Sequence, residues 1–100
     1  SHPGHEIAAR QMHGGFGGIV SVQLAAGAEA AKHFVDHTQI FTLAESLGGV
    51  ESLIEVPAAM THASVAGTTL QVPANLVRIS VGIENADDLI ADLKQALDRI

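Results

Sequence analysis

The sequence contains no cysteine, no tryptophan and no tyrosine, and it has only five basic residues against eleven acidic ones. Without cysteine there can be no disulfides, no thiolate catalysis and no cysteine zinc sites, and we predict a protein of a reducing compartment, the cytoplasm. A net charge of -6 with scattered bases excludes a nucleic-acid-binding surface and argues against binding to an anionic membrane. No apolar run reaches the roughly 20 residues that a membrane-spanning helix needs.

The length of 100 residues fits one domain, and 47% hydrophobic residues exclude a disordered chain. With only 16% charged residues, a domain this small is expected to leave apolar surface exposed. The first residues, Ser1-His2-Pro3-Gly4, are typical of a segment that connects two domains. We therefore expect this chain to be one piece of a larger protein.

Hydrophobic periodicity predicts an α+β fold in which helices cover one face of a small, mostly antiparallel sheet. Residues 1–18, with a short helix over 6–12 and a glycine-rich turn over 14–18, are expected to connect to a preceding domain, and 19–100 to form the domain itself. Strands are predicted over 19–24, 40–43, 52–56 and 76–84, with a loop over 58–74. Helices are predicted over 28–37 and from Asn85, a favourable N-cap, to the end of the chain.

The strand over 76–84 has the clearest alternation in the sequence. One face carries Val77, Ile79, Val81 and Ile83, and the other carries Arg78, Ser80 and Gly82. Small neighbours leave a shallow space beside the guanidinium of Arg78, which is suited to binding a carboxylate or phosphate through two parallel hydrogen bonds. The alternative is a surface arginine that pairs with Glu84 or Glu45.

A second candidate is the turn that runs from Glu45 through Ser46 to Gly48 and Gly49. Its glycines permit close approach of a ligand, and its hydroxyl and backbone N–H groups can bind an anion. The alternative is a plain connector between two strands. The turn gains functional weight only if it converges with Arg78.

Other motifs give weaker evidence for a functional site. The glycine cluster over 14–18 follows a helix and precedes a strand, which is the reverse of a dinucleotide-binding loop, so we interpret it as a tight turn. His2 and His5, and His33 and His37, have spacings that can chelate a metal, but no HExxH motif accompanies them and we expect solvated histidines. His62 is expected to bond a loop carbonyl.

No nucleophile is evident in the sequence. Ser46 and Ser64 lack a nearby base of known geometry, and Lys32 and Lys94 lie on polar helix faces rather than in apolar pockets. By itself the chain shows no catalytic machinery.

Three separated motifs resemble one protein family. Residues 41–55, 60–63 and 76–84 (FTLAESLGGVESLIE, MTHA and LVRISVGIE) resemble the C-terminal domain of the pyridoxal-phosphate enzymes of cysteine and methionine metabolism. That family includes cystathionine γ-synthases and cystathionine lyases, and the resemblance covers nearly the whole chain.

The resemblance implies the C-terminal domain of an aspartate-aminotransferase-like fold. Pyridoxal phosphate would be held by a large domain that is absent from this chain, so the fragment alone should be inactive. The implied partners are that large domain, a small amino-acid substrate and further copies of the enzyme, as a homotetramer.

The resemblance also implies roles for three residues. Arg78 would bind the substrate α-carboxylate, with Ser46 beside it, and Glu45 would read the far end of the substrate. At position 45 a glutamate is similar to the residue of γ-synthases and γ-lyases, since β-lyases tend to carry an aromatic residue there. The sequence of residues 63–73 resembles that of bacterial γ-synthases. The alternatives are a γ-lyase, an amino-acid-sensing regulatory module and a pure association domain.

Overall fold

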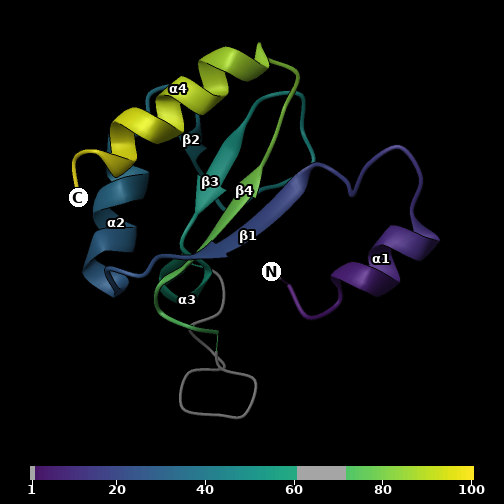
Figure 1. The fold of residues 1–100 in the computed structure, drawn as a ribbon. Helices are drawn as coiled ribbons and strands as arrows, with labels where there is room; N and C mark the ends of the chain where they lie inside the picture. Colours follow the sequence, from purple (N-terminus) through teal and green to yellow (C-terminus); the bar gives the residue numbers. More distant parts are fainter. Residues whose placement is uncertain (1, 61–71) are drawn as a thin grey trace.

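The computed structural model describes residues 2–60 and 72–100 of the chain (Figure 1). Within them lie four helices and four strands. In chain order these are α1 (His5–Gln11), β1 (Ile19–Gln23), α2 (Ala28–His37), β2 (Thr42–Leu43), β3 (Leu53–Glu55), α3 (Pro57–Met60), β4 (Leu76–Ser80) and α4 (Ala86–Leu97). None of the helices among the described residues has the length and apolar character needed to cross a bilayer.

The strands form one sheet in the order β1-β4-β3-β2. β4 is antiparallel to both of its neighbours, whereas β2 and β3 are parallel. The predicted α+β class with a mostly antiparallel sheet is therefore confirmed. Because β2 and β3 run the same way, residues 44–52 must return from the end of one strand to the start of the other, and this return carries the predicted functional turn.

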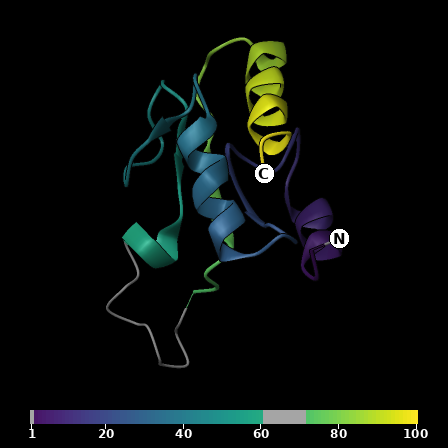
Figure 2. The ribbon, with the colours of Figure 1, turned by 90° about the vertical axis from the view of Figure 1, so that its left-hand side faces the viewer.

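Helices α2 and α4 pack on one face of the sheet, as expected, and in the view of Figure 2 α2 covers the strands behind it. Ile54 and Ile79 are register partners in β3 and β4, and they point to this helix-covered face. The core that the helices and strands share consists of Ala31, Phe34, Val35, Phe41, Ile54, Val56, Val77, Ile79, Leu89 and Ala96.

The start of α4 is fixed by a local cap. The side-chain oxygen Oδ1 of Asn85 accepts hydrogen bonds from the backbone N–H of Asp87 at 2.9 Å and of Asp88 at 3.2 Å. Both acidic residues lie in the first turn, where the helix dipole favours negative charge. The predicted cap is confirmed, and α2 covers the predicted range of 28–37.

A buried carboxylate in α4, that of Asp92, was not anticipated. It accepts backbone hydrogen bonds from Gln39 and Ile40, each at 2.7 Å, and from Phe41 at 3.1 Å. Burial raises the pKa of Asp92, but these three donors together with the Gln95 amide outweigh that effect and hold the pKa below its ordinary value. Asp92 thus fastens the connection between α2 and β2 onto α4.

Two elements in the middle of the chain differ from the predictions. β2 begins at Thr42 rather than Ile40, because the N–H groups of residues 40 and 41 bond Asp92 instead of a neighbouring strand. Pro57 opens the short helix α3 inside the predicted loop, in a first-turn position where its missing N–H costs nothing. The rest of that loop through residue 71, including His62, lies outside the described residues.

The predicted strand over 76–84 is also shorter than expected. β4 ends at Ser80, the last residue paired with both β1 and β3. Beyond it Val81 and Ile83 are exposed, Ile83 by 82%, so the apolar face of the predicted strand stays buried only at Val77 and Ile79. The chain continues along the sheet through single backbone bonds, from Val81 N to the Gly18 carbonyl and from Ile83 N to the Val50 carbonyl.

Candidate functional site

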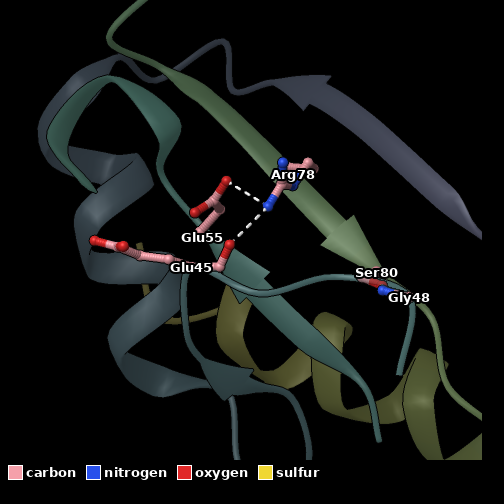
Figure 3. A network of polar contacts seen from close by, with 5 residues as sticks. All are labelled: Glu45, Gly48, Glu55, Arg78 and Ser80. Carbon is pink, nitrogen blue, oxygen red and sulfur yellow. Dashed lines mark hydrogen bonds and ion pairs between the residues drawn. The ribbon is translucent and has the colours of Figure 1, made fainter. Parts of the chain in front are cut away.

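The face of the sheet opposite α2 and α4 carries the predicted arginine. Arg78 in β4 lies directly across from Glu55 in β3, and Ser80 lies across from Leu53. Side chains alternate along a strand, so Glu55, Arg78 and Ser80 share one side, which we call the polar face. Residues 45–52, called the 45–52 segment, run along this face (Figure 3).

The guanidinium of Arg78 is held between a buried carboxylate and a backbone carbonyl. Its Nη2 lies 2.7 Å from Oε1 of Glu55 and donates to the carbonyl oxygen of Glu45 at 3.2 Å (Figure 3). The Glu55 side chain is 1% exposed and that of Arg78 19%. The cation is therefore fixed by one neighbouring strand and by the 45–52 segment, while part of it stays accessible.

Only Nη2 takes part in these two contacts. Toward residues 2–60 and 72–100, Nη1 and Nε of Arg78 donate no hydrogen bond. Since arginine carries five N–H donors in a planar fork, donors remain for an incoming anion. The arrangement can orient a carboxylate or a phosphate group.

Glu55 depends on Arg78 for charge compensation. Both carboxylate oxygens are buried, and neither accepts an aligned hydrogen bond from the described residues, so among these residues the ion contact with Nη2 supplies the charge compensation. A buried charge that loses its partner is strongly destabilising. Removing the arginine would therefore leave the Glu55 carboxylate buried without the positive charge of Arg78 beside it.

The open space predicted above Ser80 and Gly82 is occupied by the chain itself. The hydroxyl of Ser80 accepts a hydrogen bond from the backbone N–H of Gly48 at 2.8 Å, and a Cβ on Gly82 would overlap the carbonyl oxygen of Val50. Gly48 has a φ of 78°, a left-handed conformation that favours glycine. The small side chains thus make room for backbone, and the expectation of a hollow at these two residues is wrong.

The predicted site residues come together only in part. The structure brings Glu45 to Arg78 through its carbonyl oxygen, while its carboxylate points away from the arginine (Figure 3). Ser46, next in the chain, is exposed, and its side chain makes no hydrogen bond to the described residues. The turn and Arg78 therefore converge, but through the backbone of the turn.

The predicted ion pairs of Arg78 with Glu45 or Glu84 are wrong, because its partner is Glu55. Glu84 instead accepts from Ser52, from the backbone N–H at 2.9 Å and from the hydroxyl at 2.6 Å. The Ser52 hydroxyl and N–H, with the backbone N–H of Glu84 itself, hold the pKa of Glu84 below its ordinary value. The signal for Glu55 was a single charged residue inside the otherwise apolar run Leu53-Ile54-Glu55-Val56.

The two lysines of the chain lie on the helix-covered side of the sheet. Lys32 in α2 lies 3.6 Å from Glu29, and Lys94 in α4 lies 3.0 Å from Asp98. Their side chains are 56% and 74% exposed. Both lysines therefore lie on exposed helix faces, as the sequence predicted.

Within the described ranges there is no cluster of three or more histidine, aspartate or glutamate side chains that would hold a metal ion. The rings of His33 and His37 stack with centroids 4.8 Å apart, and Nδ1 of His37 lies 2.6 Å from the His33 carbonyl oxygen. The Nδ1 atom of His37 is therefore already hydrogen-bonded, although His33 and His37 have the spacing of a chelating pair.

The fold and the polar face together define a small α+β domain with one partly exposed guanidinium, held by a carboxylate and a backbone carbonyl. Residues 1–98 match the family of Cys/Met metabolism PLP-dependent enzymes, where PLP is pyridoxal phosphate. The chain belongs to this family, as its sequence motifs indicated.

Its relatives include several enzymes of that family. The chain is 65% identical over 98 residues to a cystathionine γ-synthase of Mycobacterium leprae and 53% identical over 102 residues to a cystathionine β-lyase of Lactococcus lactis. These alignments cover 98% and 99% of this chain, but only 25% and 26% of the relatives. The chain thus spans about a quarter of the length of the curated relatives it matches.

Solved structures agree with this assignment. The crystal structure of metB from Corynebacterium glutamicum superposes with a TM-score of 0.92 at 61% identity, covering 98% of this chain and 25% of that one. Cystathionine γ-lyase from yeast superposes with a TM-score of 0.82 at 47% identity, covering 98% and 26%. The small mixed sheet and its helices are therefore a domain of this enzyme fold.

Proposed function

We propose that this chain is the C-terminal domain of a pyridoxal-phosphate-dependent cystathionine γ-synthase, which replaces the acyloxy group on Cγ of an O-acyl-homoserine with the sulfur of cysteine and releases the carboxylic acid. Identity supports this reaction: it reaches 65–67% with γ-synthases, against 53% with a β-lyase and 50% with a γ-lyase. The observation that carries the role of the domain is Arg78, a partly exposed guanidinium whose Nη1 and Nε donate no hydrogen bond to residues 2–60 and 72–100.

In this proposal Arg78 binds the α-carboxylate of the substrate. Glu55 and the Glu45 carbonyl hold Nη2, so the remaining donors face a fixed direction and the arginine side chain loses less conformational entropy when the substrate binds. The Ser46 hydroxyl, exposed on the same turn, donates to the same carboxylate. The Glu45 side chain points away from Arg78 and reads the far end of the substrate.

The cofactor belongs to another part of the full-length enzyme in this proposal. Pyridoxal phosphate supplies an electron sink for carbanionic chemistry when bound. A large domain would hold it, with residues 1–18 as the connection; α1 buries none of its own residues, which supports a connecting role. We further propose that the enzyme is a cytoplasmic homotetramer and that this domain alone is inactive.

The second candidate reaction is γ-elimination. Cystathionine γ-lyases from Dictyostelium discoideum and from yeast are 50% and 47% identical to this chain, so the domain is compatible with both reactions. Membership in an enzyme family leaves the amino-acid-sensing module and the pure association domain without supporting observations.

The test is a product assay on the full-length enzyme. With O-acyl-homoserine and cysteine we expect cystathionine to form faster than the same enzyme breaks cystathionine down. Release of cysteine and 2-oxobutyrate from cystathionine as the dominant reaction would identify a γ-lyase. Release of homocysteine and pyruvate would identify a β-lyase and contradict the role given to Glu45.

A further inference from the structure

Every second residue from Arg78 to Glu84 contacts the 45–52 segment. Arg78 bonds the Glu45 carbonyl at the start of the segment, and Ser80 bonds the Gly48 N–H in its middle. Gly82 and Glu84 both bond Ser52 at its end. We propose that Gly82 and Glu84 are positioning residues that fix the 45–52 segment, and with it the substrate-binding turn, against Arg78. This inference rests on the proposed role of Arg78 in binding substrate.

Gly82 acts by having no side chain. A Cβ at this position would overlap the carbonyl oxygen of Val50 and lie 2.7 Å from both the carbonyl carbon of Glu51 and Oε1 of Glu84. The Glu84 side chain can rotate, but the first two atoms are backbone, so the segment itself would have to move. The same approach allows the backbone N–H of Ile83 to bond the Val50 carbonyl at 2.8 Å.

Glu84 and Ser52 close the end of the segment. The buried hydroxyl of Ser52 donates to Glu84 Oε1 at 2.6 Å and accepts from the Gly82 N–H at 2.9 Å. The Ser52 N–H donates to the other carboxylate oxygen at 2.9 Å. The Glu84 carboxylate thereby satisfies both donors of the fully buried Ser52, and the Ser52 hydroxyl satisfies the N–H of Gly82.

A displacement of the 45–52 segment would affect the substrate site through the Glu45 carbonyl oxygen. The Glu45 carbonyl oxygen is one of the two partners of Arg78 Nη2, and Ser46 follows it directly. Moving this carbonyl frees the guanidinium to rotate around Glu55 and carries the Ser46 hydroxyl away. The lost orientation is expected to weaken binding of the amino acid rather than its conversion.

The chain supplies a matched control for Gly82 outside the binding turn. Gly18 is exposed, its φ is outside the left-handed region, and the nearest atom to an added Cβ, the carbonyl oxygen of Val81, is at an ordinary contact distance of 3.6 Å. Gly82→Ala and Gly18→Ala are thus the same chemical change, one at a position without space and one at a position with space.

The experiment measures KM and kcat for O-acyl-homoserine in the full-length enzyme, with cofactor absorbance near 420 nm as a check on the loaded site. Gly82→Ala is expected to raise KM about tenfold while kcat changes by less than about threefold, since uniform binding is lost. Gly18→Ala should leave both within about twofold, as for a surface change. In an Arg78→Ala background Gly82→Ala should add little, because both act on one interaction.

Glu84→Gln decides the case if Gly82→Ala fails to fold. Its amide keeps the shape but offers an N–H where one carboxylate oxygen accepted, and we expect KM to rise about threefold or more. Unchanged KM in a folded Gly82→Ala enzyme, or in Glu84→Gln, overturns the positioning role. If Arg78→Ala itself leaves KM unchanged, the proposed carboxylate role has failed instead.

Discussion

The two faces of the sheet are built on different physical principles. The helix-covered face is apolar, and its members interlock by shape with α2 and α4. The polar face buries a carboxylate against a guanidinium and is covered by backbone that fits only over small residues. Substitutions on the first face should therefore change stability alone, whereas substitutions on the second should change substrate binding.

The largest effect is expected from Phe34→Ala on the helix-covered face. Phe34 is 2% exposed in the core, and truncating a buried phenylalanine costs about 3–5 kcal/mol of unfolding free energy. Phe34→Leu keeps most of the volume and should cost less than about 1.5 kcal/mol. Urea and thermal unfolding of the full-length enzyme measure both. A raised KM in the folded Phe34→Leu enzyme would contradict the separation of the faces.

Arg78→Ala should have the largest effect on the polar face. We expect KM for the amino-acid substrate to rise about 100-fold, since charge-assisted bonds to the carboxylate are lost. Arg99→Ala, at an exposed position near the end of the chain, is the control and should leave KM within about twofold.

The same substitution should lower stability by leaving Glu55 buried without its cation. Adding Glu55→Gln to Arg78→Ala should recover thermal stability without recovering KM. This double variant separates the structural part of the ion pair from its part in binding. Recovery of both quantities would show that Arg78 has only a structural role.

A smaller effect is expected at Asp92, the polar anchor of the helix-covered side. Asp92→Asn replaces an acceptor of three backbone N–H groups by an amide that presents donors to some of them, at a cost of about 1–3 kcal/mol. Asp36→Asn, exposed on α2, should change stability by less than about 0.5 kcal/mol. Equal unfolding midpoints for the two variants would contradict the anchoring role.

The smallest effect is expected for the stability of the protein at acidic pH. The pKa values of Glu84 and Asp92 are lowered from the ordinary 4.5 and 3.8, so their contribution to stability is complete above those values. It is lost as the pH falls through the lower folded-state values, because the unfolded chain then binds more protons. Unfolding midpoints measured between pH 6 and 3 should fall less steeply in Asp92→Asn than in the parent enzyme. Parallel curves would show that Asp92 is not linked to folding in this way.

The amino-acid sequence by itself determined the features that depend on neighbours a few residues away. Hydrophobic periodicity predicted the positions of α2 and α4, and Asn85 predicted the N-cap of α4. The alternation of apolar and polar residues around Arg78 predicted the face of the sheet on which Arg78 lies. The three motifs also identified the family. These signals are local, because helix and strand periods and caps repeat within one or two turns of chain.

Tertiary structure alone decided what each polar group contacts. Arg78 and the Glu45 carbonyl are 33 positions apart, and Asp92 reaches backbone more than 50 positions away. The sequence could show that Ser80 and Gly82 are small, but not that folded backbone fills the space they leave. Strand order and the parallel return from β2 to β3 set these contacts, and neither has a local signature in the chain.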